Sequence, residues 1–166
     1  HKAIRRQRQM CIRDRDYIQE LSRVLRYTLQ SNESQSVSLR EEMEFASAYI
    51  FLLKMRFENN LQFDIQIAKS FEDYRLPPMA VQVLIENAVK HNEISDRKPL
   101  TIHIVTNNEG YLSVSNDIQP KRTAASGTGI GLVNLAKRYR LLFKQDIQIT
   151  EDKEFSVCIP LIDEVQ

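Results

Sequence analysis

Residues 126–140, SGTGIGLVNLAKRYR, contain three of the four glycines in this chain of 166 residues. These glycines, at positions 127, 129 and 131, lead directly into a segment of helical character. Glycine lets backbone N–H groups approach an anion closely, and the first turn of a helix adds unpaired N–H groups and a positive dipole end. The stretch therefore predicts a phosphate-binding loop. A flexible turn before an ordinary helix is the simpler alternative.

Two common nucleotide-binding motifs do not account for this stretch. No Gly-Lys-Ser/Thr follows, which excludes the Walker pattern. The glycines also do not close a strand–turn–helix unit of the form that binds dinucleotides. Any phosphate site here belongs to another class of protein.

Bulk composition excludes further classes. Lys and Arg total 23 against 22 Asp and Glu, so the chain has no bias toward polyanions, and we expect no nucleic-acid partner. The hydrophobic content of 42% is typical of a soluble globular protein, and no apolar run is long enough to span a membrane. Cys11 and Cys158 lack the spacing of a metal site, and a reduced compartment is favoured over a disulfide.

The first third of the chain predicts helices. Residues 1–15 are basic and nearly patternless, whereas residues 16–30 place apolar side chains at helical spacing. After a polar break, Ser38 and Glu41 form the pattern of a capping box, which predicts a second helix over residues 40–58.

From Leu61 onward the apolar period changes from helical to alternating. Two prolines at 77 and 78 suit the start of a helix within residues 76–92. The expected strands are 61–67, 100–108, 111–117, 147–152 and 154–161, and a last helix covers 131–143. This order predicts an α/β (α+β) sandwich behind a helical segment.

The helix expected over residues 76–92 has two contrasting faces. Glu86, Asn87, Lys90 and His91 share the arc opposite its apolar side chains. Such a set suits a hydrated Mg²⁺ ion and phosphates, since it offers oxygen ligands and a point charge. An ordinary amphipathic helix with a solvated polar face is the alternative.

An ENAVKH helix, a β-hairpin, a polar loop and then GTGIGLVN resemble the ATP-binding domain of sensor histidine kinases. More narrowly, four blocks resemble the LytS-like histidine kinases of two-component systems: ELSRVLRYTL, EEMEFASAYIFLLKMRF, LPPMAVQVLIENAVKHN and GTGIGLVNLAKRYRLLF. The resemblance covers residues 16–160. It implies the Bergerat (GHKL) fold, a two-layer α/β sandwich with a mixed sheet, preceded by a helical segment.

The same resemblance implies a division into domains. Residues 58–163 would be the ATP-binding catalytic domain, and residues 16–57 would come from the dimerisation and phosphoacceptor region. Leu21, Leu25 and Leu29 would then form part of a bundle seam, with packing on the domain's own core as the alternative.

The resemblance also implies roles for individual residues. Asn87 would coordinate Mg²⁺, and Glu86 beside it would be the polarising base, so these two are the catalytic candidates. Lys90 and His91 would contact phosphates or hold a lid formed by residues 121–128. The remaining candidates for binding the cofactor are Asn116, Asp117, Gly127, Thr128, Gly129, Ile130, Gly131 and Leu132.

The implied function is phosphoryl transfer from Mg-ATP to a histidine, and from there to a response regulator. The family implies a homodimer, a regulator of the LytTR type and a location on the cytoplasmic side of the bacterial inner membrane. Contact with the membrane would come only through a missing N-terminal part, and the fragment itself would be soluble. A non-catalytic platform of the same fold, serving nucleotide binding or dimerisation, is the alternative.

The segment SNDIQP departs from the adenine-binding box of related kinases. Asn116 stands where those kinases have Asp, and Ile118 and Pro120 stand in glycine positions. An amide oxygen can still accept a hydrogen bond from the adenine amino group, but without the strengthening charge. Alternatively, Asn116 only caps the end of a strand.

The phosphoaccepting histidine of the family has no counterpart here. His1 begins HKAIRR, which does not match the family's Pro-His-Phe-Leu-Phe-Asn block, and His103 lies in a predicted strand. Residues 1–15 do not match the family, and RRQRQMCIRDR at residues 5–15 resembles translated adapter sequence, with a basic amphipathic arm as the alternative. We therefore expect a fragment of a larger kinase that is not self-sufficient.

Overall fold

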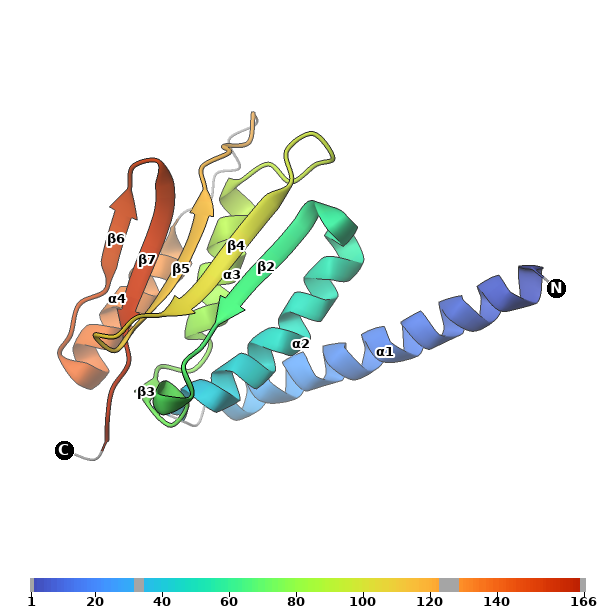
Figure 1. Cartoon of the computed structure of the whole chain (residues 1–166). Coiled ribbons are helices and arrows are strands. Elements are labelled where there is room, and N and C mark those ends of the chain that lie inside the picture. The colour runs from blue at the N-terminus through green and yellow to red at the C-terminus, as the bar shows by residue number, and fades with distance from the viewer. Residues whose placement is uncertain (1, 32–34, 123–128, 165–166) are drawn as a thin grey trace.

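The computed structural model describes residues 2–31, 35–122 and 129–164. A five-stranded sheet has helices on one side, and a long N-terminal helix extends away from this body (Figure 1). The elements are α1 (Lys2–Ser31), β1 (Val37–Ser38), α2 (Leu39–Phe57), η1 (Glu58–Asn60), β2 (Leu61–Gln66), η2 (Lys69–Phe71), β3 (Arg75–Leu76), α3 (Ala80–His91), β4 (Leu100–Thr106), β5 (Tyr111–Asp117), α4 (Ile130–Phe143), β6 (Gln148–Glu151) and β7 (Glu154–Pro160).

The sheet is mixed, with strand order β2-β4-β5-β7-β6. β2 runs parallel to β4, and the remaining neighbours are antiparallel, including the two predicted hairpins β4–β5 and β6–β7. Alternation places one face of the strands against the helices. The largest buried side chains of this face include Ile102, Ile104, Leu112 and Ile159. The predicted α/β fold with a mixed sheet is confirmed.

Helix α2 begins with the predicted capping box. The Glu41 N–H donates to Ser38 Oγ at 3.2 Å, and the Ser38 N–H donates to Glu41 Oε2 at 3.2 Å. Two N–H groups that lack partners within the helix are satisfied in this way. The helix then buries Leu39, Ala46 and Leu53 in the core shared with the sheet.

Helix α1 is longer than the sequence indicated, because it includes the basic segment as well as residues 16–30. Near its C-terminal end the ring of Tyr27 stacks on Phe45 of α2, with centroids 4.2 Å apart. Leu21 and Leu25 are exposed, so the alternative in which they pack on the domain's own core is wrong. The side chain of Leu29 lies outside the described residues.

The start of helix α3 differs from the expectation. The helix begins at Ala80 rather than at the proline pair, and Leu76 belongs to β3, which pairs antiparallel with β1. A residue that precedes proline is disfavoured in the helical region, which keeps Leu76 and Pro77 extended. Met79, the residue before the helix, has a left-handed backbone with φ 68°.

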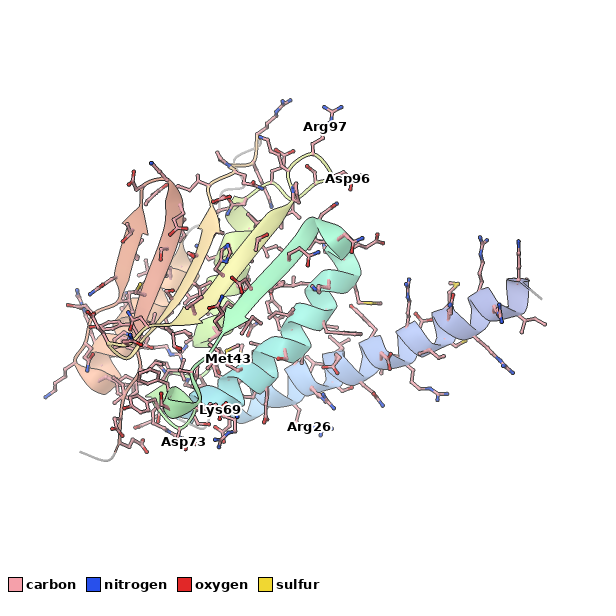
Figure 2. The ribbon with its side chains drawn as sticks, viewed as in Figure 1. Arg26, Met43, Lys69, Asp73, Asp96 and Arg97 are labelled. Atoms are coloured by element: carbon pink, nitrogen blue, oxygen red, sulfur yellow. The ribbon has the colours of Figure 1, made fainter. Side chains whose placement is uncertain are left out.

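Helix α3 runs the length of the sheet, from one end of the strands to the other (Figure 1). It starts near β3, on the side where Lys69 and Asp73 lie, and ends toward the loop that carries Asp96 and Arg97 (Figure 2). Its C-terminal half, with the ENAVKH sequence, therefore lies at the second of these ends. Among the described residues, no helix is both long and apolar enough to cross a bilayer.

Candidate functional site

The two faces of α3 are as the sequence predicted. Val81, Leu84, Ile85 and Ala88 are buried in the core beneath the helix. Asn87 is half-buried, whereas Glu86, Lys90 and His91 are exposed on the other side. The helix thus presents an amide, a carboxylate, an ammonium and an imidazole away from the core.

The first turn of α4 lies against this polar face. Gly129 precedes the helix in a left-handed conformation, with φ 61° and ψ 10°, which glycine adopts without the penalty of a side chain. A Cβ added to Gly131 would stand 3.4 Å from Cγ1 of Val83 on α3. Glycine therefore sets both the backbone turn and the close approach of α4 to α3. Gly127 and Thr128 lie outside the described residues.

A pocket of about 110 Å³ lies between the two helices. It is lined by Val83, Glu86, Asn87, Lys90, His91, Gly129, Ile130, Gly131 and Leu132. Small-molecule sites usually enclose about 300–1,000 Å³, so this pocket matches only a small polar group such as a phosphate with its metal ion. Val83 is the one lining residue that the sequence analysis did not name. Its apolar side chain faces Gly131, and no sequence motif marks it.

The pocket offers too few oxygen ligands for protein side chains alone to enclose a metal ion. Among the described residues there is no group of three or more His, Cys, Asp or Glu side chains that could hold a metal ion. Mg²⁺, however, usually keeps several waters and is held by one or two protein oxygens together with substrate phosphates. Asn87 and Glu86 fit that manner of binding, in which the ion arrives with its nucleotide.

Asn116 and Asp117 do not line this pocket. They lie at the end of β5, where Asn116 is 1% exposed and Asp117 is exposed. The Asn116 Nδ2 donates to the carbonyl of Asp117 at 2.8 Å, which orients the amide. Its Oδ1 is therefore the atom that can accept a hydrogen bond from a ligand.

A pair of residues that the sequence analysis missed joins the end of α3 to the segment after β5. The Gln119 N–H donates to Asn92 Oδ1 at 2.8 Å, and Asn92 Nδ2 donates to the Ala88 carbonyl at 2.8 Å. The Glu93 N–H in turn donates to the Gln119 carbonyl at 2.7 Å. Asn92 is buried. Its hydrogen bonds therefore fix the position of the C-terminal end of α3 relative to the segment that follows β5.

Glu86, which lines the pocket, affects the pKa of Tyr49 on α2. Burial, with a smaller contribution from the negative charge of Glu86, raises the pKa of Tyr49 to about 12. Tyr49 therefore stays neutral at physiological pH and contributes no negative charge of its own.

Comparison with known proteins decides the family. The family model described as Histidine kinase matches residues 4–61, a range that begins within the basic segment. The sensor protein LytS of Streptococcus mutans is 34% identical over an alignment of 151 residues, and the match covers 81% of this chain and 26% of that protein. LytS of Staphylococcus epidermidis is 29% identical over an alignment of 139 residues, and the match covers 75% of this chain and 24% of the relative. The chain is a homologue of the LytS-like sensor histidine kinases.

Solved structures agree on the fold of this LytS homologue. The catalytic domain of the histidine kinase ThkA superposes with a TM-score of 0.53 at 18% identity, covering 77% of this chain and 99% of that one. The histidine kinase domain of a blue-light activated kinase from Erythrobacter litoralis has a TM-score of 0.52 at 14% identity, covering 96% and 85%. The chain spans about a quarter of the length of its curated LytS relatives.

For this LytS homologue the structure brings together most of the residues that the sequence singled out. The α3 set and the glycine stretch from Gly129 onward share one pocket. Asn116 and Asp117 stand apart from it on β5. His103, expected to be structural or exposed, lies half-exposed in β4, where its Nδ1 is 3.0 Å from Oδ2 of Asp64.

Proposed function

We propose that this chain is the ATP-binding catalytic part of a sensor histidine kinase, which transfers the γ-phosphoryl group of Mg-ATP to a histidine. The observation that carries the proposal is the pocket in which Asn87 and Lys90 of α3 face the glycine-led first turn of α4. An oxygen ligand, a cation and a helix N-terminus converge there, and each suits a metal-bound phosphate.

The residues of the pocket divide the work of binding. The Asn87 amide oxygen would hold Mg²⁺, while Lys90 and His91 would contact phosphate oxygens. The N–H groups from Gly129 onward would donate hydrogen bonds to the phosphate oxygens at the positive end of α4. Glu86 would polarise the attacking group. Bound Mg²⁺ supplies neutralisation of phosphate charge, and phosphoryl transfer depends mainly on such positioning and charge.

Base recognition would fall to β5. With its Nδ2 bonded to the Asp117 carbonyl, Asn116 offers Oδ1 to the amino group of adenine. The bond would lack the charge that an aspartate brings. Asn116, Ile118 and Pro120 favour the second candidate function, a non-catalytic platform of the same fold for nucleotide binding or dimerisation.

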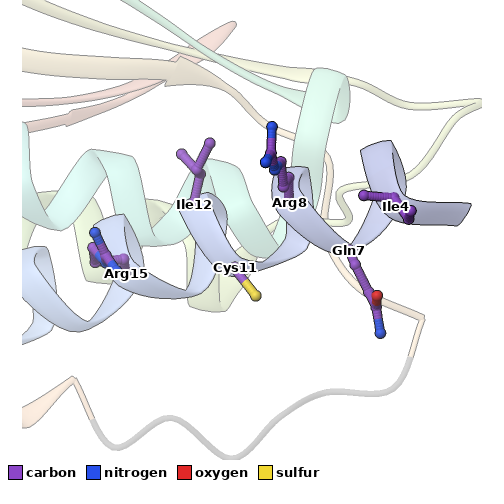
Figure 3. Close-up of a pocket in the computed structure, with 6 residues that line it drawn as sticks. All are labelled: Ile4, Gln7, Arg8, Cys11, Ile12 and Arg15. Atoms are coloured by element: carbon purple, nitrogen blue, oxygen red, sulfur yellow. The ribbon is translucent and has the colours of Figure 1, made fainter. Parts of the chain in front are cut away.

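We also propose that the chain acts as a homodimer through α1. Ile4, Cys11, Ile18 and Leu25 recur every seven residues along this helix, and all four are exposed. An apolar heptad position of this kind is typical of helices that associate with one another. Figure 3 shows residues around a shallow hollow in this region, and all of them project from α1 itself.

The remaining parts of the proposal concern the whole protein. The phosphate would pass on to a response regulator, with one of the LytTR type as the specific expectation. The intact kinase would sit at the cytoplasmic side of the bacterial inner membrane. Both expectations come from the family rather than from any residue described above.

The test is Mg²⁺-dependent binding of ATP and ADP to the full chain by calorimetry, with Asn87→Ala as the variant. We expect micromolar-range binding that EDTA abolishes and that Asn87→Ala weakens at least tenfold, because the variant removes the metal's protein ligand. Asn59→Ala, an exposed change in η1, is the matched control and should bind as the parent does. Nucleotide binding that is unchanged both by EDTA and by Asn87→Ala would favour the non-catalytic platform. If a folded sample binds no nucleotide at millimolar concentration, the kinase proposal fails.

A further inference from the structure

The N-terminal end of α3 lacks a cap of its own. Met79 occupies the capping position, makes no side-chain hydrogen bond there and holds a left-handed backbone with φ 68°. Ser, Thr, Asp and Asn are the usual residues at this position, because their side chains accept hydrogen bonds from the free N–H groups of the first turn. A non-glycine residue in the left-handed region persists only when its surroundings hold it there.

Glu42 of α2 supplies the missing acceptor from a distant part of the chain. Its Oε2 accepts the Met79 N–H at 3.2 Å, and its Oε1 accepts the Val81 N–H at 3.1 Å. The side chain is fully buried, at 0% exposed. A buried carboxylate is unfavourable unless donors surround it, so this arrangement joins α2 and the first turn of α3 as one unit.

The third donor to Glu42 comes from α1. The Tyr27 hydroxyl donates to Oε2 of Glu42, and the Tyr27 ring stacks on Phe45 one turn further along α2. Burial, followed by the charge of Glu42, raises the pKa of the Tyr27 phenol, so the group remains a protonated donor. Three donors now meet one carboxylate, which matches its ionised form.

Arg138 of α4 also holds the segment that immediately precedes α3. The Arg138 guanidinium donates to the Pro78 carbonyl, and its positive charge favours the ionised form of Glu42. Burial raises the pKa of Glu42, and the donors together with Arg138 oppose that effect. Helices α2 and α4 thus contact the residues at the start of α3 directly, and α1 is linked to them through Glu42.

We infer that Glu42 is a positioning residue for the nucleotide site and that Tyr27 couples it to α1. The inference rests on the proposed function, since it names a control of the same site. Asn87 lies six residues after Val81, which is about 9 Å along a helix, so a shift of the first turn reaches the pocket directly.

The physical reason for coupling is the count of donors around Glu42. If α1 turns or slides, the Tyr27 hydroxyl leaves the carboxylate, and a buried oxygen loses one of its partners. Glu42 then holds the strained Met79 and the first turn of α3 less firmly. Because α3 carries Asn87 and Lys90, the metal and phosphate ligands lose their fixed position.

The first experiment measures amide hydrogen exchange in the full chain for Tyr27→Phe, which keeps the ring and removes only the hydroxyl. We expect exchange at Met79 and Val81 to become about fivefold faster, the effect of losing one hydrogen bond of typical strength. Amides in the central strands β4 and β5 should be unchanged, which separates local loosening from global unfolding. Tyr17→Phe, which lies on the same helix and is 40% exposed, is the matched control.

The second experiment measures affinity for Mg-ATP in Tyr27→Phe, Glu42→Gln and the double variant. We expect weaker binding, by threefold to tenfold, in Tyr27→Phe. The double variant should bind no more weakly than Glu42→Gln alone, because both changes act through the same carboxylate. Tyr17→Phe should bind as the parent does.

The outcomes separate this inference from the kinase proposal. If the parent binds nucleotide and Tyr27→Phe behaves like Tyr17→Phe in both experiments, the coupling is overturned. Multiplicative losses in the double variant would also overturn it. If the parent binds no nucleotide, the proposed function fails and Glu42 is no positioning residue for it. Faster exchange at Met79 and Val81 would then still establish that Tyr27 of α1 stabilises the start of α3 through Glu42.

Discussion

At the residue scale, Asp64 and His103 face each other across β2 and β4, with His103 Nδ1 3.0 Å from Asp64 Oδ2. The sequence predicts His103 to be structural or exposed but gives it no partner, because the pairing depends on the register of two parallel strands. The faces of α3, by contrast, follow from helical geometry alone, and Asn87 and Lys90 lie on the side that the sequence indicated.

The Asp64–His103 pair gives a prediction for pH dependence. The hydrogen bond from His103, with a smaller one from Gln66, holds the pKa of Asp64 below its ordinary value. A depressed folded-state pKa contributes stability above the unfolded pKa of about 4, and this stability is lost as pH falls through the folded value. In His103→Gln we expect the Asp64 pKa to rise, as measured by NMR titration of the side-chain carboxyl. Gln66→Ala is the comparison and should raise it less; equal values in parent and His103→Gln would contradict the assignment.

At the element scale, helices α2 and α3 show two ways of starting a helix. The cap of α2 lies within four residues of sequence, Ser38 to Glu41, and was predicted. The cap of α3 comes from Glu42, which is 37 residues from Met79 and 39 from Val81. A capping motif in the sequence reveals only a local cap such as that of α2, because only a local cap has a constant spacing between its residues.

The local cap gives a stability prediction. Ser38→Ala should lower the free energy of unfolding by about 1 kcal/mol, the usual cost of losing a serine at the start of a helix. Urea unfolding followed by circular dichroism measures this. The matched control is Ser47→Ala within the same helix, where the hydroxyl donates to the Met43 carbonyl and caps nothing. A change in Ser38→Ala no larger than in Ser47→Ala would argue against the capping box.

At the scale of the whole molecule, α1 is the element that the body leaves uncovered. Its C-terminal end packs on α2 through Tyr27, while Ile4, Ile18 and Leu25 are 59%, 61% and 57% exposed. Side chains of this kind in a regular stripe usually mark a surface that associates with another helix. In Figure 1 the N-terminal part of α1 projects from a compact body, away from the sheet.

This arrangement predicts self-association of the full chain. In analytical ultracentrifugation we expect a dimer that forms with rising concentration, and Ile18→Glu should shift it to monomer by placing a charge on the stripe. Gln19→Glu adds the same charge on another face of α1 and should leave the dimer intact. A parent chain that stays monomeric at all concentrations would remove the basis for a dimer through α1.

The sequence by itself determined the order of the main helices and of the five strands of the large sheet, the capping box of α2, the polar face of α3 and the glycines before α4. Each of these depends on residues within a few positions of one another, where the periods of helix and strand are constant. Only the tertiary structure decided that β2 pairs with β4, that Asn92 holds Gln119 and that Glu42 caps α3. Those contacts join residues that lie far apart along the chain, and they exist only once the core has packed, since a buried polar group takes whichever partner the fold brings to it.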